Sequence, residues 1–213
     1  MFSQELDEDE EPIKVVAMPN ANCKGYCRVL LDKTSTEFFL ENLSRVEMAN
    51  RCYLWRILFD QVRLIKISPM DFLTAVQTHL LPETEGQIVT FILEKVCWIV
   101  ENGLVENSPH ADFTEHAVSL TLGVIADTLV DKIHNLPEAK HADKTLLVDH
   151  YIKLLPAADS YDKLVDMAIA QNLAVDGKQV SALNKLQRYA CLRKCAAVVS
   201  SDEEAKEIAR LIE

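Results

Sequence analysis

The sequence predicts a mainly α-helical protein, an irregular stack of about nine helices of the HEAT or armadillo kind with a short β segment at its N-terminus. Apolar residues recur at helical spacing along most of the chain after residue 34, and the intervals between these segments are short. Helices with one or two apolar stripes must bury them on neighbouring helices, which a layered stack of hairpins achieves. A closed helical bundle is the alternative. No clear sequence period appears, so irregular repeats are expected.

The sequence divides into three parts. Residues 1–12 are rich in acidic residues and are expected to form a mobile tail or linker, and residues 34–213 form the helical domain. Between them, residues 13–33 hold two β-prone runs, 13–18 and 26–31, joined by a turn-rich connector. Two strands alone are marginally stable in water, so these runs should lean on the helices or on a sheet outside this chain.

Two consecutive helices within residues 50–83 organise the prediction. The first has apolar residues on two sides, which is typical of an inner helix. The second begins at Ser68, a hydroxyl cap followed by Pro69 at the first helical position. Asp60 lies four residues after Arg56 and three before Arg63, a spacing that allows ion pairs on the solvent side.

The other helices are predicted from their stripes and ends. They cover 34–46, 84–100, a long segment with the stripe Val118 to Leu136, 143–155, 160–171, 178–199 and 201–212. Gly103 is expected as a left-handed cap, and the long helix has a second apolar stripe of Phe113, Ala117, Leu120 and Val124. No strand is expected after Ser35.

Composition argues against several classes of function. The net charge is −11, from 22 basic and 33 acidic residues, and no cluster of Lys and Arg with aromatic residues appears. Nucleic-acid binding is therefore not expected. No apolar run has the length of a membrane span, and the acidic N-terminus is unlike a secretory signal, so we expect a cytoplasmic protein without membrane contact. The six cysteines are expected to be reduced thiols.

No catalytic or metal-binding residue is predicted, and substrate-binding residues cannot be assigned. The sequence has no His-Glu-x-x-His motif and no Gly-rich phosphate loop. Two pairs of cysteines four residues apart, Cys23 with Cys27 and Cys191 with Cys195, could together form a four-thiolate site, but small buried side chains are the favoured interpretation. The histidines are expected near helix ends, solvated or favoured by the helix dipole; they are His79, His134, His141 and His150.

The order of polar landmarks resembles the C-terminal part of the M1 zinc aminopeptidases. These landmarks are Pro19-Asn20, Gly25-Tyr26-Cys27-Arg28-Val29, Asp32, Asn50-Arg51, Asp60, the Ser68 helix start, Leu80-Leu81-Pro82-Glu83, and later Arg188-Tyr189 with the segment 201–213. In that family a strand segment of this form closes a β-sandwich and leads into an all-helical domain.

The resemblance implies that this chain is the non-catalytic C-terminal domain of a peptidase. Zinc and catalysis would belong to a catalytic domain preceding Met1, which would be the partner of this chain, and the helical domain would cover the chamber that peptide substrates enter. Arg51 and Asp60 lie on opposite helix faces and cannot pair directly, so Arg51 should anchor a neighbouring segment and Asp60 should cap or pair elsewhere.

Two alternatives remain from the sequence. One is a stand-alone helical-repeat scaffold that binds a protein or peptide partner along one face. The other is a zinc or redox protein that uses its cysteines.

Overall fold

The computed structural model describes residues 15–21, 24–103, 115–137, 140–156, 161–175 and 178–197, together with Arg210. Within them the chain is mainly helical, as predicted. The elements in chain order are α1 (Lys33–Asn42), the 3-10 helix η1 (Leu43–Arg45), α2 (Met48–Arg63), α3 (Pro69–His79), α4 (Gly86–Glu101), α5 (Glu115–Asn135), α6 (His141–Leu154), α7 (Tyr161–Ala170), β1 (Asn172–Val175), β2 (Lys178–Ala182) and α8 (Lys185–Ala196).

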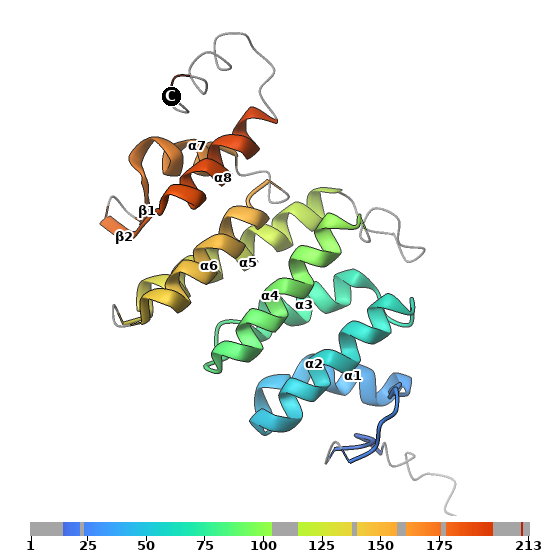
Figure 1. Ribbon diagram of the computed structural model, residues 1–213. Coiled ribbons are helices and arrows are strands. Elements are labelled where there is room, and N and C mark those ends of the chain that lie inside the picture. The colour runs from blue at the N-terminus through green and yellow to red at the C-terminus, as the bar shows by residue number, and fades with distance from the viewer. Residues whose placement is uncertain are drawn as a thin grey trace, which may run out of the picture.

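The helices form two layers of a stack (Figure 1). On the odd-numbered side α1 contacts α3 and α3 contacts α5, while on the even-numbered side α2 contacts α4, α4 contacts α6 and α6 contacts α8. The first and last of these helices lie at opposite ends of the molecule (Figure 1). Because α1, α3 and α5 pack in succession on one side, and α2, α4, α6 and α8 on the other, the architecture is the layered stack and not the closed bundle.

An aromatic cluster joins α2, α3 and α4 in the core. The rings of Trp55 and Phe72 meet edge to face with centroids 5.4 Å apart, and Phe59 contacts Trp98 in the same way at 5.3 Å. Trp55 and Phe72 are almost fully buried. Edge-to-face contacts of this kind stabilise a fold by about 1 kcal/mol beyond the burial of area. The pair of helices expected within residues 50–83 is therefore confirmed as an inner part of the stack.

Local signals fix the ends of several helices. The carboxylate of Asp32 accepts a hydrogen bond from the Ser35 backbone at 2.9 Å and caps α1, and the Ser68 hydroxyl accepts one from the Met70 backbone and caps α3. Gly103, just after α4, has φ of 59°, a left-handed conformation that favours glycine. The predicted cap residues Ser68 and Gly103 are confirmed.

The prediction of β-strands within residues 13–33 is wrong for the described residues, because 15–21 and 24–32 contain no strand. Val29 and Leu31 are buried against the helices, and the described backbone N–H groups of Ala17 and Leu31 donate to side chains of helices instead of to a second strand. The N–H of Leu31, for example, donates to Oε1 of Gln61 at 2.9 Å. A β-branched run needs a partner edge to become a strand, and here the helices supply apolar contact without one.

The strands lie elsewhere, where a helix or no strand was expected. β1 and β2 pair antiparallel, and Val175 pairs with Lys178 across the dipeptide Asp176-Gly177. Asp-Gly between two short runs is a strong hairpin signal that the sequence analysis missed. The helix predicted over 178–199 is consequently shortened to α8. Phe113 and the helix predicted over 201–212 lie outside the described residues, apart from Arg210.

Gln61 provides a test of how the N-terminal segment is held. This side chain is 2% exposed, accepts from Leu31 and donates to Thr36 Oγ1 at 3.1 Å. Gln61→Ala leaves both partners buried without a hydrogen bond, and we expect a loss of about 3 kcal/mol in the free energy of unfolding, measured by urea denaturation. Gln87→Ala, on the exposed side of α4, should change it by less than about 0.5 kcal/mol. Equal effects of the two substitutions would contradict this role.

Candidate functional site

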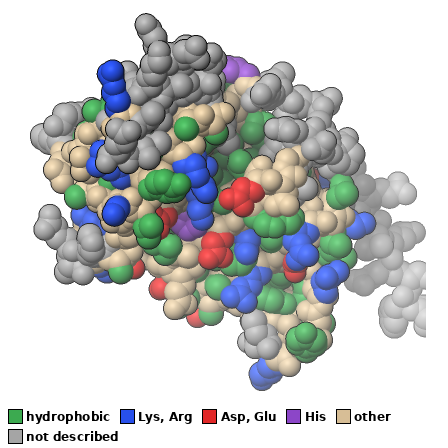
Figure 2. Space-filling view, turned by 45° about the horizontal axis from the view of Figure 1, so that its top comes forward, with side chains coloured by type: hydrophobic (Ala, Val, Ile, Leu, Met, Phe, Trp, Pro, Cys, Tyr) green, Lys and Arg blue, Asp and Glu red, His purple; other side chains and the backbone are tan. Residues whose placement is uncertain are grey.

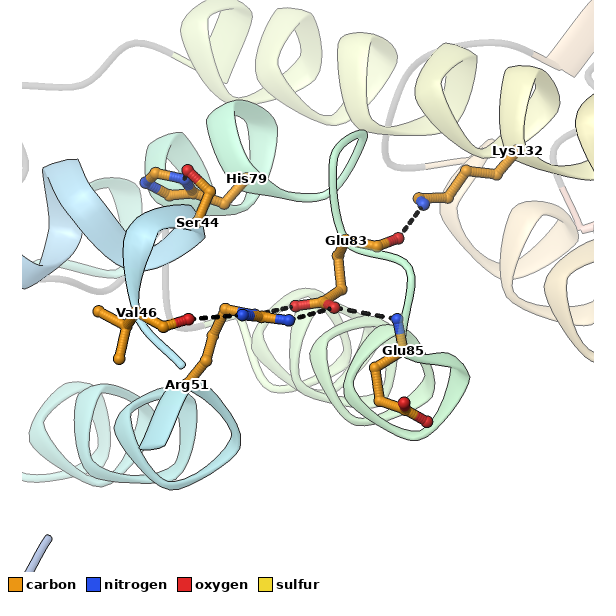
Figure 3. Close-up of polar contacts among 7 residues, drawn as sticks. All are labelled: Ser44, Val46, Arg51, His79, Glu83, Glu85 and Lys132. Atoms are coloured by element: carbon orange, nitrogen blue, oxygen red, sulfur yellow. Dashed lines mark hydrogen bonds and ion pairs between the residues drawn. The ribbon is translucent and has the colours of Figure 1, made fainter. Parts of the chain in front are cut away.

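Arg51 and Glu83 form the most buried ion pair among the described residues (Figure 3). Nε and Nη2 of Arg51, in the first turn of α2, donate to the two carboxylate oxygens of Glu83 at 2.5 and 2.9 Å. Nη1 donates to the carbonyl oxygen of Val46 at 2.6 Å. Glu83 precedes α4, so the pair ties α2 to the connection between α3 and α4. The prediction that Arg51 anchors a neighbouring segment is confirmed.

Glu83 also reaches two other elements. Its carboxylate accepts from the backbone N–H of Glu85 at 3.0 Å, and its backbone carbonyl accepts from Nζ of Lys132, on α5, at 2.6 Å. Burial alone would raise the pKa of Glu83, but the hydrogen bonds from Arg51 and from the Glu85 backbone hold it below its usual value. Burial lowers the pKa of Lys132, against the opposing charge of Glu83.

A groove of about 300 Å³ opens beside this network. It lies between the start of α4, the end of α5 and the start of α6, and its residues include Leu81, Val89, Lys132, Asn135, Asp143 and Leu146. Leu81 and Leu146 are partly exposed at 55% and 38%. An apolar wall with a few polar groups is typical of binding sites, and this volume is at the small end of their range. The groove can accept a side chain or two of a peptide.

Two of the histidines expected near helix ends are buried, and one of them, His79, does lie in the last turn of α3. The Nε2 of His79 lies 2.8 Å from the Leu40 carbonyl and its Nδ1 3.2 Å from the Ser44 hydroxyl (Figure 3). Since a carbonyl only accepts, Nε2 carries the hydrogen and Nδ1 accepts from Ser44. Burial lowers the pKa of His79, so the neutral ring is favoured. The interpretation of His79 and His150 as solvated side chains is wrong.

His150 forms a buried contact with a cysteine. Its Nδ1 lies 3.6 Å from Sγ of Cys97, and the two residues come from α6 and α4. Burial raises the pKa of Cys97 to about 11 and lowers that of His150. A nucleophilic cysteine needs the thiolate and benefits from a charged imidazole, and this environment disfavours both. The pair is therefore a thiol that donates to a neutral ring.

Of the four cysteines that could have formed a thiolate site, the three that are described do not come together. Cys191 and Cys195 are buried on α8, and burial raises the pKa of Cys191 to about 12. Cys27 is exposed and belongs to the segment before α1, which lies at the opposite end of the stack from α8 (Figure 1), and Cys23 is outside the described residues. Among the residues that are described, no group of three or more His, Cys, Asp and Glu side chains could hold a metal ion. Cys191 and Cys195 act as small apolar core residues.

The expected surface pairs of α2 are partly formed. Nη1 of Arg63 lies 3.5 Å from Oδ1 of Asp60, as the spacing indicated. Asp60 therefore pairs with Arg63 and not with Arg51. Arg56 instead places its guanidinium 5.6 Å from the centre of the Phe91 ring on α4.

Sequence reasoning missed the groove, the Lys132 contact and the Cys97 pair with His150. The bonded residues are 49 and 53 positions apart in the last two cases, and only the packing of α4, α5 and α6 joins them. No local pattern carries that information.

The fold defines the class of this protein as a helical-hairpin stack. A scan against protein-family models, a search of curated proteins and a search of solved structures found no match. The resemblance to aminopeptidases therefore stays a prediction from the residues quoted above. None of the described helices has both the length and the apolar character needed to cross a bilayer.

Substitution of Arg51 tests how much the buried ion pair contributes to the stability of the fold. Arg51→Met leaves the Glu83 carboxylate, 2% exposed, without its cation. We expect the free energy of unfolding, measured by denaturant titration, to fall by about 3 to 5 kcal/mol. Arg63→Met, which removes the exposed pair with Asp60, should cost at most about 1 kcal/mol. Adding Glu83→Leu to Arg51→Met should restore part of the loss, because no buried charge then remains unpaired. A loss after Arg51→Met no larger than that after Arg63→Met would overturn this assignment.

His79 makes stability depend on pH. Its pKa is lower in the folded chain than in the unfolded chain, so protons bind preferentially to the unfolded state as pH falls through about 6.5. The free energy of unfolding should therefore decrease from pH 7.5 to 5.5. His79→Gln keeps a donor for the Leu40 carbonyl but cannot titrate. The urea midpoint of this variant should therefore change less between pH 7.5 and 5.5 than that of the unmodified chain. A slope unaffected by His79→Gln would show this account to be wrong.

Proposed function

We propose that this chain is the C-terminal, non-catalytic domain of a zinc aminopeptidase that removes N-terminal residues from peptides. In this proposal the helical stack covers the active-site chamber and limits which peptides enter. Zinc and the catalytic residues belong to a preceding domain, which is the partner of this chain, and no catalytic residue is assigned here. The whole protein acts in the cytoplasm, which suits the five free cysteines among the described residues.

The observation that carries the proposal concerns the residues on which the resemblance rests. Asn20 binds both the N–H and the carbonyl of Gly25, at 2.9 and 3.0 Å, and donates to the Tyr53 hydroxyl on α2 at 3.1 Å. A Cβ at Gly25 would lie 3.2 Å from Oδ1 of Asn20, so this close approach favours glycine. Asp32 and Ser68 cap helices, and Arg51 pairs with Glu83 within the Leu80 to Glu83 stretch. These landmark residues therefore have structural roles near the start of the stack, whereas Tyr26, Arg28 and Tyr189 of the same set are exposed.

Exposed apolar side chains at the N-terminal end of the stack also support the proposal. Tyr26 is fully exposed, and Leu30, Phe38 and Met48 are 48%, 43% and 51% exposed. Exposed apolar side chains also occur elsewhere along the chain, and those in this first part of the stack could contribute to a contact with another domain. A preceding catalytic domain would cover this end, since the chain enters the stack there.

A stand-alone scaffold is the second candidate function. The groove beside Lys132, with the partly exposed Leu81 and Leu146, favours it, because a helical stack can bind a peptide segment without any catalytic domain.

The test is to capture the native protein from the source cells with an antibody raised against this chain. The proposal predicts a captured polypeptide several times heavier than this chain. The captured material should cleave a leucine amide substrate and release its fluorophore. A zinc chelator should abolish this activity, and added zinc should restore it. Capture with a non-immune antibody is the control.

A captured polypeptide with the mass of this chain alone, and without aminopeptidase activity, would contradict the proposal. The stand-alone scaffold would then be favoured.

A further inference from the structure

Charge is divided unequally between the two layers of the stack. The four odd-numbered helices carry eight acidic and three basic residues, whereas the four even-numbered helices carry ten basic and five acidic residues. The whole chain has a net charge of −11, so the positive even-numbered layer is an exception within an acidic protein. Such a separation creates a surface field that attracts groups of the opposite charge.

Four of these ten basic residues lie on α8, where no acidic residue offsets them. Its twelve residues include Lys185, Arg188, Arg193 and Lys194 and no acidic residue. None of the four forms an ion pair with another described residue, whereas basic residues of α1, α2, α4 and α7 do. The Nε of Arg188 is buried and has no hydrogen-bond partner. The charge of α8 is therefore not neutralised by the part of the chain that the structure describes.

Two of these cations share a face with exposed apolar side chains. We define the α8 stripe as Lys185, Leu186, Tyr189 and Arg193, which are all exposed; Leu186 is 80% and Tyr189 57% exposed. The opposite face, with Gln187 and the two cysteines, packs on α6 and the core. Figure 2 shows that Lys, Arg and hydrophobic side chains also occur together elsewhere on one face of the molecule, where Asp and Glu side chains lie among them.

We propose that the α8 stripe binds an acidic polypeptide segment of a partner protein, with apolar side chains placed between its carboxylates. Lys185 and Arg193 lie eight residues apart on one helix, about 12 Å along its axis, and each can pair with a separate carboxylate. Leu186 and Tyr189 lie between them and supply the apolar contact, and exposed tyrosines are frequent anchors of protein interfaces.

The chemistry of the stripe favours polypeptide over nucleic acid. A nucleic acid presents a long row of phosphates, and the acidic remainder of this chain would repel all of those beyond the stripe. A short acidic segment needs only the few cations that α8 provides. The expected binding is steered by charge, so it should be fast and should weaken as salt is added.

This inference does not depend on the proposed function. The α8 stripe lies at the opposite end of the stack from the N-terminal segment, where the catalytic domain is proposed to dock (Figure 1). Either proposal can fail while the other holds.

The experiment uses the intact chain and a fluorescein-labelled acidic peptide, with Glu at most positions and Leu at helical spacing. Fluorescence anisotropy should report binding that weakens at least about tenfold between about 20 and 150 mM salt. Lys185→Glu/Arg193→Glu should weaken binding at low salt by at least about tenfold, and Leu186→Ser by about threefold to tenfold with an unchanged salt dependence. The same peptide with Gln for Glu should not bind measurably. Circular dichroism melting confirms that each variant is folded.

The matched control is Lys33→Glu/Lys163→Glu, which makes the same change of net charge on the odd-numbered helices α1 and α7. Binding by this variant should stay within about twofold of the unmodified chain. An equal loss in both double variants would show that only total charge matters and would overturn the proposal. So would an intact chain that binds the peptide no better than Lys185→Glu/Arg193→Glu.

Discussion

The pairing of Arg51 with Glu83 is the constraint on which the rest of the stack depends. A buried carboxylate is tolerated only when its cation and its remaining hydrogen bonds are in place, so the pair fixes α2 relative to the start of α4. The backbone carbonyl of the same glutamate accepts from Lys132, which brings in α5. One residue in a connection thus relates three successive hairpins, and the groove between α4, α5 and α6 follows from that arrangement.

Other buried polar side chains do the same at different levels of the stack. Gln61 holds the N-terminal segment, His79 joins α3 to α1, and Gln187 joins α8 to α6. Apolar stripes drive the helices together, but hydrophobic contact has no direction and permits a helix to slide or rotate on its neighbour. Hydrogen bonds inside the core fix which position faces which, because a buried group without its partner is costly.

What the sequence predicted well is local. Helical stripes, the Ser68 cap and the left-handed Gly103 depend on a few consecutive residues, and the fold class follows from them. The function of Arg51 as an anchor was predicted, but its partner could not be, because the two residues are 32 positions apart. The N-terminal β prediction failed because a β-branched run buries equally well against helices. The hairpin of β1 and β2 was missed because its second strand was absorbed into the following helix, despite the Asp-Gly signal.

The successive contacts within each layer also determine how the molecule responds to a mechanical force. If the molecule is pulled at its two ends, the contacts between successive helices bear the force one after another along the stack. The weakest of these contacts breaks first. Between α6 and α8, the side-chain amide of Gln187 donates to the Thr145 carbonyl and to Oδ1 of Asp149 at 3.0 and 2.8 Å. At the other end of the stack, α2 is joined to the segment before α4 by the buried bidentate pair of Arg51 with Glu83, so the two levels are expected to resist extension by different means.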